Sequence, residues 1–268
     1  MLQKLFPHLR SAGQRSQSAP VLRDPAAAHP VTSGQAIAED PLSDFTEADR
    51  RLEAQVRPYT MTSCERIYQL ARAVEYLEKN AIPGAIVECG VWRGGSMMAA
   101  ALTLLRLGAT SREIYLYDTF EGMPPPKSVD VRHDGVAASA ILDTRAKSKD
   151  DTYWAYASLE DVKANLRSTG YPPERIHYVP GKVEDTLPQT GPAAIALLRL
   201  DTDWYSSTQH ELLHLYPRLS PEGVLIIDDY GWWKGQKQAV DEYFAQLPFQ
   251  PLLQRIDSAS RICIKPSR

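Results

Sequence analysis

The fold is decided by residues 85–96, AIVECGVWRGGS, in which a short apolar run meets a glycine-rich turn. An apolar run of this length, bounded by turn residues, is typical of a buried strand. The residues after the turn, 95–107, have the composition and spacing of a helix. A strand that passes through a glycine turn into a helix is the first unit of an α/β sheet.

The same alternation of strands and helices continues along the chain. Further strands are expected at 113–118, 175–181, 195–201 and 223–230. Further helices are expected at 158–169, 207–219 and 236–246. Such alternation is typical of a mostly parallel sheet with helices on both faces. The tail differs, because 251–257 and 261–266 are joined by a short turn and strands so close must pair antiparallel. We therefore expect an α/β fold that ends in an antiparallel hairpin.

The N-terminal part of the chain has another character. Residues 1–48 are rich in Ser, Ala, Pro and Gln with little periodicity, which predicts a flexible extension before one domain at 49–268. Regular structure is expected from about Tyr59. Thr62 and Glu65 have the spacing of a capping box. They precede a helix that Pro83-Gly84 ends and whose apolar positions are Ile67, Leu70, Ala71, Val74 and Leu77.

Composition argues against several classes of protein. The 268 residues include 30 basic and 33 acidic ones, a net charge of −3 that gives no reason to expect nucleic acid or a membrane surface as partner. No stretch approaches the roughly 18 apolar residues of a membrane span. The N-terminus lacks the apolar run of a secretory signal, which predicts a cytoplasmic protein. Cys64, Cys89 and Cys263 are expected to be buried apolar residues. A homo-oligomer is left open.

Ligands of an open α/β sheet bind beyond the carboxyl ends of its strands. The first strand leads into Gly90, Gly94 and Gly95, where the backbone can approach a ligand closely. The turn has neither the G-x-G-x-x-G spacing nor the lysine of a phosphate-binding loop. Glu88 suits a ligand with a positive group, and Asp118, at the end of the second strand, can bond ribose hydroxyls. Together they predict a nucleoside site, although each alone is also consistent with a turn or a cap.

Four carboxylates follow the fourth and fifth strands, namely Asp201, Asp203, Asp228 and Asp229. Neighbouring strands would bring them to one edge of the sheet, where crowded carboxylates repel one another and favour a bound cation. All-oxygen ligation suits Mg²⁺. The structural alternatives are helix capping by Asp201 or Asp203, and pairing of Asp228 with Arg199 or Lys234.

Six motifs, in this order, carry a resemblance: TMTSCERI, VECGVWRGGS, YDTFEGMP, GYPPERIHYVPGKVEDTLP, LLRLDTDWYSST and VLIIDDYGWWKGQKQAVDEY. From about Tyr59 to the C-terminus the chain resembles the macrocin O-methyltransferase family, whose members methylate the sugars of antibiotics. The N-terminal arm carries no clear match. The resemblance implies a class I, Rossmann-like methyltransferase fold, S-adenosylmethionine as methyl donor, and a divalent metal, Mg²⁺, that holds the acceptor.

The resemblance also assigns roles to residues. Asp201, Asp228 and Asp229 match metal-binding acids, and Asp203 matches a general base, with the roles of Asp201 and Asp203 open to exchange. The expected cofactor-binding residues are Thr62, Glu88, Gly90, Val91, Trp92, Ser96, Asp118, Thr119, Phe120, Gly122, Val183 and Glu184. The implied acceptor is a hydroxyl of a deoxysugar on a small-molecule glycoside, with a phenol or catechol as the alternative. Residues 123–157, which vary in such enzymes, are expected to form a lid.

Competing motifs are weaker. His210-Glu211-Leu212-Leu213-His214 matches the H-E-x-x-H pattern of zinc peptidases, but no histidine follows His214 and the α/β pattern is foreign to them. An amphipathic helix is the preferred interpretation. Tyr230 and Lys234 have the spacing of an oxidoreductase pair, but the dinucleotide glycine pattern is missing. His133, in the expected lid, is more simply interpreted as a solvated loop residue than as a group that assists the acceptor.

Overall fold

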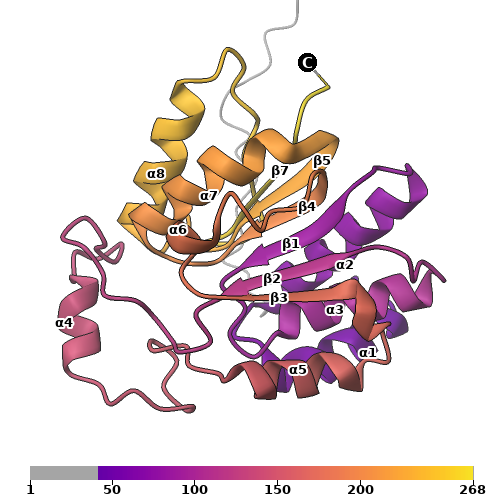
Figure 1. Cartoon of the computed structure of the whole chain (residues 1–268), viewed down its shortest axis with the longest axis horizontal. Helices are drawn as coiled ribbons and strands as arrows, with labels where there is room; N and C mark the ends of the chain where they lie inside the picture. The colour runs from indigo at the N-terminus through magenta and orange to yellow at the C-terminus, as the bar shows by residue number, and fades with distance from the viewer. Residues whose placement is uncertain (1–41, 268) are drawn as a thin grey trace, which may run out of the picture. The chain divides into compact units, whose positions relative to one another are not determined.

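One sheet, in the strand order β3-β2-β1-β4-β5-β7-β6, runs through residues 42–267, the part of the chain that the computed structural model describes (Figure 1). Its strands are β1 (Ala85–Cys89), β2 (Ile114–Asp118), β3 (Ile176–Pro180), β4 (Ile195–Leu200), β5 (Leu219–Ile227), β6 (Gln254–Arg255) and β7 (Arg261–Ile264). The first five pair in parallel, whereas β7 is antiparallel to both β5 and β6. The predicted α/β fold with a C-terminal antiparallel pair is confirmed.

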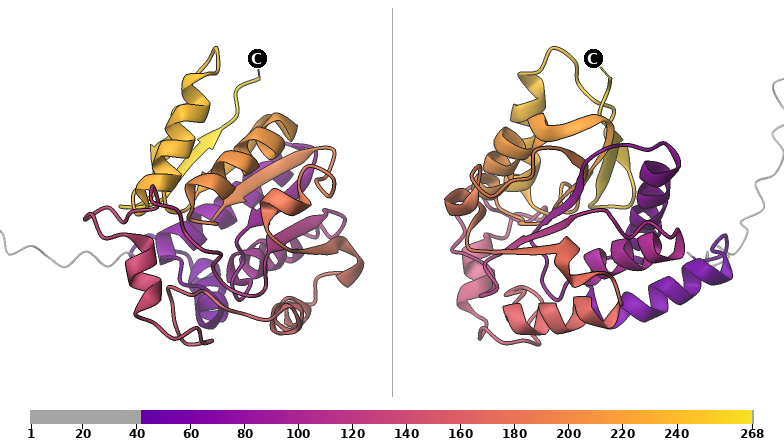
Figure 2. Two further views of the ribbon diagram at one scale, coloured as in Figure 1. Left: turned by 60° about the vertical axis from the view of Figure 1, so that its left-hand side comes forward. Right: turned by 45° about the vertical axis from the view of Figure 1, so that its right-hand side comes forward.

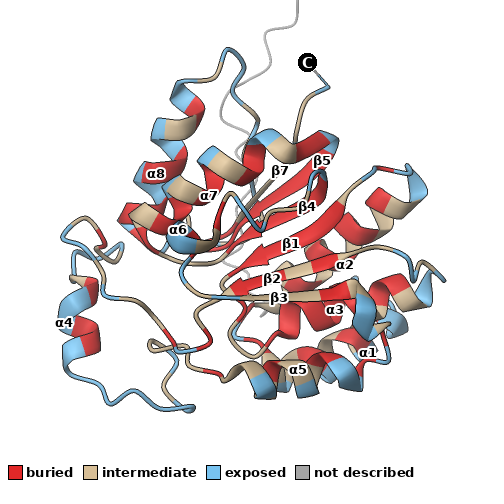
Figure 3. Ribbon diagram, viewed as in Figure 1, coloured by how far each residue is buried: buried red, intermediate tan, exposed pale blue. Residues whose placement is uncertain are grey.

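Helices cover both faces of the sheet (Figures 1 and 2). One layer consists of α1 (Glu47–Val56), α2 (Cys64–Lys79), α3 (Gly95–Arg106) and α5 (Leu159–Ser168), and the other of α6 (Val183–Thr186), α7 (Tyr205–Leu215) and α8 (Lys234–Ala245). Figure 3 shows the buried strands between the layers. Within β1, Ile86 packs in the first layer and Val87 in the second, because successive side chains of a strand point to opposite faces.

Short segments complete the chain. Single 3₁₀ turns lie at Arg57–Tyr59, Pro173–Arg175 and Tyr216–Arg218, and α4 (Ala138–Asp143) lies within the segment predicted to be a lid. No helix among residues 42–267 is long and apolar enough to cross a membrane.

Folded structure begins earlier than predicted. Helix α1 starts at Glu47, within the range expected to be flexible, and Thr46 caps it in a reciprocal capping box with Asp49. Leu52 and Val56 are its buried apolar residues. Regular structure therefore begins before Tyr59, where it was expected, because this short helix gains its stability from packing rather than from a long periodic pattern. The expectation for residues 1–41 lies outside the described residues.

Two other expectations need correction. Ser63, not Thr62, caps α2 by accepting a hydrogen bond from the Arg66 amide, so Thr62 is left free to point elsewhere. Helix α7 ends at Leu215 rather than at 219, because Pro217 cannot continue an α-helix. Of the cysteines, Cys89 and Cys263 are buried as expected, whereas Cys64 is only half-buried.

Candidate active site

A cavity of about 440 Å³ opens at the carboxyl edge of the parallel strands. The segments that follow β1, β2, β3, β4 and β5 all contribute to its wall, as the sequence argument requires. Of the twelve residues expected to bind the cofactor, eleven line it; the exception is Phe120, whose ring packs into the hydrophobic core. The four aspartates Asp201, Asp203, Asp228 and Asp229 line the same cavity.

The glycine turn after β1 is shaped by close packing. Gly90 has a φ of 81°, and a Cβ there would lie 2.1 Å from the carbonyl oxygen of Asp201. Only glycine lets the first strand end so near the fourth. The glycine turn therefore lies next to the acidic segment 201–203.

Asp118 holds this turn from the neighbouring strand. Its carboxylate accepts hydrogen bonds from the amides of Val91, at 2.7 Å, and Trp92, at 3.2 Å, and from Phe120 at 2.7 Å. Burial raises the pKa of Asp118, and these amide bonds oppose that shift. The structural role weighed for this residue is thus present; its expected bond to a ribose remains a prediction.

Glu88 is buried with one oxygen unused. Its side chain is 1% exposed; Oε1 accepts from Arg199 Nη1 at 2.5 Å, while Oε2 has no protein partner although Glu88 lines the cavity. Burial raises the pKa of Glu88 to about 7, against the pull of Arg199. A buried acceptor without a donor is costly, so this oxygen suits a cationic group of a ligand in the cavity.

Three of the four aspartates form a compact acidic cluster. Carboxylate oxygens of Asp201, Asp203 and Asp229 all lie within 4.8 Å of one another. Burial, together with the charge of Asp201, raises the pKa of Asp203 to about 8. Burial also raises the pKa values of Asp201 and Asp229, reinforced by the neighbouring carboxylates. Asp203 has a φ of 68°, rare for a residue with a side chain, in the bend that presents it to the cavity.

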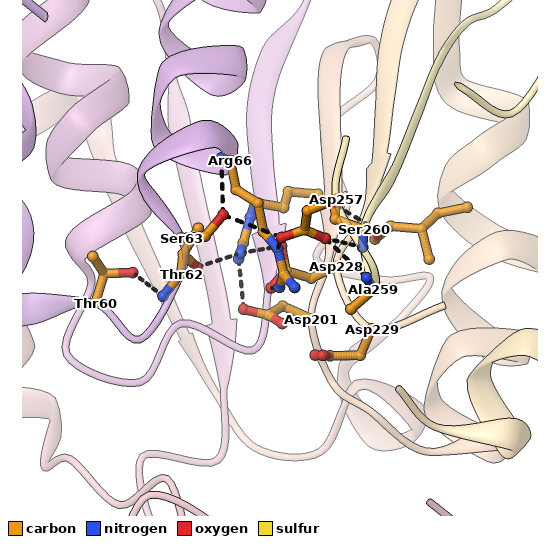
Figure 4. A network of polar contacts seen from close by, with 12 residues as sticks. Thr60, Thr62, Ser63, Arg66, Asp201, Asp228, Asp229, Asp257, Ala259 and Ser260 are labelled. Atoms are coloured by element: carbon orange, nitrogen blue, oxygen red, sulfur yellow. Dashed lines mark hydrogen bonds and ion pairs between the residues drawn. The ribbon is translucent and has the colours of Figure 1, made fainter. Parts of the chain in front are cut away.

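Asp228 instead pairs with two arginines, Arg66 and Arg199. Figure 4 shows Asp228 beside Arg66. Its Oδ2 accepts from Arg66 Nη1 at 2.7 Å, and Arg199 Nη2 lies 2.6 Å from its Oδ1 in an ion pair without hydrogen-bond geometry. Arg66 also donates to Asp257, in the turn between β6 and β7. The pairing of Asp228 with Arg199 that the sequence left open is present, and its role as a metal ligand remains a prediction.

Thr62 reaches the same network. With the α2 cap supplied by Ser63, the Thr62 hydroxyl accepts from Arg199 Nη2 at 3.0 Å and lines the cavity. Sequence reasoning missed Arg199 itself as a site residue. A single arginine in an apolar strand, two positions before Asp201, was the available signal.

Residues 123–157, the segment expected to be a lid, form one wall of the cavity and are hydrogen-bonded to residues 204 and 205. Asp130 is 1% exposed and accepts from the amides of Tyr205, at 2.8 Å, and Lys127, at 2.7 Å. Trp204 Nε1 donates to the carbonyl of Pro124 at 2.9 Å. The wall and the start of α8 share an apolar cluster around Trp204 and Trp233. Sequence reasoning missed Asp130, since nothing distinguished it from the exposed acids of that loop.

The H-E-x-x-H motif does not form a metal site. Glu211 is fully buried and accepts from Thr202 Oγ1 at 2.8 Å, while His210 and His214 contact each other at 4.3 Å between ring centroids. Burial raises the pKa of Glu211 to about 8. Among residues 42–267, the acidic cluster is the single group of three or more side chains placed to hold a metal. His133 is exposed, with its ring against Trp232.

The strand order, the glycine turn and the acidic edge together define a class I methyltransferase. The family model for macrocin O-methyltransferases matches residues 17–263, so it reaches further into the N-terminal arm than the motifs did. This chain belongs to that family and is an O-methyltransferase.

Individual relatives of this chain are also named as O-methyltransferases. A tetracenomycin-C 4'-O-methyltransferase of Streptomyces olivaceus, named for a substrate with a dimethoxy-rhamnosyl group, is 34% identical and covers 79% of this chain and 78% of its own. The demethyldecarbamoylnovobiocin O-methyltransferase of Streptomyces niveus is 33% identical over 82% of this chain and 85% of its own. The solved structure of the O-methyltransferase NovP superposes with a TM-score of 0.66 at 33% identity, covering 78% and 82% of the two chains.

Proposed function

We propose that this enzyme transfers the methyl group of S-adenosylmethionine to a hydroxyl of a deoxysugar on a small-molecule glycoside of an antibiotic pathway, with Mg²⁺ at the acidic cluster. One observation carries the proposal: the unpartnered oxygen of Glu88 and the cluster Asp201, Asp203 and Asp229 belong to the same cavity. The names of the two curated relatives, both antibiotic O-methyltransferases, support the acceptor class.

The residues present fit the donor. Glu88 Oε2 is a buried acceptor that would bond the ammonium of the methionine part of S-adenosylmethionine. Asp118 accepts three amide bonds and a longer contact, 3.5 Å, from the Thr119 hydroxyl. That hydroxyl also donates to the Gly122 carbonyl at 2.8 Å, so a ribose hydroxyl would take its place on Asp118. Val183 and Glu184, after β3, would lie beside the base.

The residues also fit a hard divalent cation. Three carboxylates lie within 4.8 Å and all have raised pKa values, although Arg199 pairs with Asp201 and the charge of Arg66 partly offsets the shift at Asp229. When bound there, Mg²⁺ would lower the pKa of a coordinating hydroxyl and fix its position. Asp201 and Asp229 are placed to hold it, and Asp228 can join them only by releasing an oxygen from Arg66 or Arg199.

Asp203 is the proposed general base. In the metal-free protein, burial and the charge of Asp201 raise the pKa of Asp203 to about 8, so its carboxylate is a stronger proton acceptor than that of an ordinary aspartate. Its carboxylate lies within 4.8 Å of those of Asp201 and Asp229. Asp203 would take the proton of the acceptor hydroxyl as the oxygen attacks the methyl group.

Aromatic side chains suit the acceptor. Trp232, Trp233 and Tyr153 line the cavity together with Met123 and Pro124. Flat apolar faces next to polar groups bind sugar rings and attached ring systems, and they exclude water from the reacting oxygen.

The test is a screen of deoxysugar glycosides and simple phenols with S-adenosylmethionine and Mg²⁺, read by mass spectrometry. A methylated glycoside is expected, with the methyl group on the sugar. If only phenols are methylated, the acceptor class is a phenol and not a sugar. If glycosides bind to the enzyme but none is methylated, the proposed activity is refuted. The cytoplasmic location and the oligomeric state remain predictions.

A further inference from the structure

The guanidinium of Arg199 contacts both halves of the proposed site at once. Nη1 donates to Glu88 Oε1 at 2.5 Å and to Asp201 Oδ2 at 2.6 Å. Nη2 donates to Thr62 Oγ1 at 3.0 Å and lies 2.6 Å from Asp228 Oδ1. The side chain is 2% exposed, so water does not screen these contacts.

The sheet itself creates this arrangement. Glu88 of β1 and Arg199 of β4 are partners in the parallel register, so their side chains emerge side by side on one face. Asp201 follows two residues after Arg199 and lies on the same side, as the ion pair shows. Arg199 therefore stands where the strand that bears Glu88 meets the segment that bears Asp201.

A buried cation this well bonded fixes its partners. The planar guanidinium offers its hydrogens in fixed directions, so each bonded oxygen is held in place. With Oε1 held, the second oxygen of Glu88 is left without a protein partner at the cavity. With Oδ2 held, the Asp201 carboxylate is fixed beside those of Asp203 and Asp229 in the acidic cluster.

We propose that Arg199 is a positioning residue for both ligands, orienting Glu88 toward the methyl donor and Asp201 toward the metal, and thereby linking the two binding sites. This inference rests on the proposed function. It assigns Arg199 no contact with the reacting atoms. As a consequence, a substitution of Glu88 changes the affinity for the metal through the guanidinium that Glu88 shares with Asp201, although Glu88 is not a metal ligand.

The first test is Arg199→Lys, studied by two calorimetric titrations below the unfolding temperature. Lysine keeps the charge, but its single ammonium cannot reproduce the fork that joins Glu88, Asp201 and Thr62. We expect the affinity for S-adenosylhomocysteine, measured in EDTA, and the affinity for Mg²⁺, measured without donor, each to fall at least about fivefold. A role in stability alone would lower the unfolding temperature and leave both affinities within twofold of wild type, which would overturn the proposal.

A second variant keeps the inference testable if Arg199→Lys does not fold. Glu88→Gln retains the size and the acceptor oxygen but removes the charge, so Arg199 is drawn more strongly to Asp201 and Asp228 and competes with the metal. Mg²⁺ affinity without donor should fall about three- to tenfold. The matched control is Glu184→Gln, because Glu184 lines the same cavity but is not among the acids that pair with Arg199.

Equal Mg²⁺ affinities in the Glu88 and Glu184 variants would contradict the link through Arg199. Failure of the proposed donor and metal sites gives a different result, since the wild-type enzyme would then bind neither S-adenosylhomocysteine nor Mg²⁺.

Discussion

Replacing Asp203 with asparagine separates the general base from the metal ligands. The change removes the proton acceptor but keeps the size of the side chain. Loss of a general base typically lowers turnover by a factor of about 10² to 10⁴, equivalent to about 2.7–5.4 kcal/mol in the activation barrier. We expect kcat of Asp203→Asn to fall within that range.

Metal affinity should change little in the same variant. With a pKa of about 8, Asp203 carries a proton at pH 7 in the metal-free enzyme, so a neutral asparagine resembles the state that is already present. Asp201 and Asp229 keep their places in the cluster. Calorimetric titration with Mg²⁺ should therefore give nearly wild-type affinity for Asp203→Asn, whereas Asp201→Asn should weaken binding and also lower turnover.

The pH dependence completes this test. Raising the pH should partly rescue Asp203→Asn, because hydroxide can replace the missing carboxylate as proton acceptor. Turnover is best measured from pH 6.5 to 9.5 at saturating Mg²⁺, with Asp201→Asn in parallel. Loss of metal by Asp203→Asn, with no rescue at high pH, would refute the assignment and require the roles of Asp201 and Asp203 to be exchanged or merged.

Three further results are expected. EDTA should abolish turnover and leave S-adenosylhomocysteine binding intact by calorimetry, and Asp229→Asn should reproduce that loss at ordinary Mg²⁺ concentrations; full turnover of metal-stripped enzyme would exclude the metal role. Asp118→Ala should weaken S-adenosylhomocysteine binding by about 1.5–3 kcal/mol through loss of charge-assisted bonds, and an unchanged dissociation constant would limit Asp118 to its turn. The metal-free enzyme should unfold at lower temperature as the pH rises from 6 to 9, because Glu88, Asp203 and Glu211, with pKa values of about 7, 8 and 8, bind protons in the folded state that they would lack when unfolded; calorimetric scans that show rising stability over this range would contradict these shifts.

Much of the fold followed from the sequence because buried parallel strands leave an unambiguous pattern. The apolar runs at 85–90 and 195–201 coincide with β1 and β4 to within a residue. The acids after β4 and β5 could be placed together for the same reason, since parallel strands end at one edge. Helices α1 and α4 were missed because they are short and owe their stability to tertiary contacts.

The partners of each acid could not be predicted. The sequence offers Asp228 and Asp229 as equivalent neighbours, yet Asp228 faces Arg66 and Arg199 while Asp229 joins the cluster. That difference depends on the register between β1 and β4 and on the position of the α2 cap, which a single sequence does not contain. Arg199 was overlooked for the same reason.

The central claim is that one cavity holds the methyl donor at Glu88 and a divalent cation at the acidic cluster. Crystals grown with S-adenosylhomocysteine and Mn²⁺, with an anomalous difference map recorded for the manganese, test it directly. The account predicts the donor's ammonium on the free oxygen of Glu88 and a manganese peak bound by Asp201 and Asp229. A donor ammonium bound elsewhere, or a manganese peak away from these carboxylates, would contradict it.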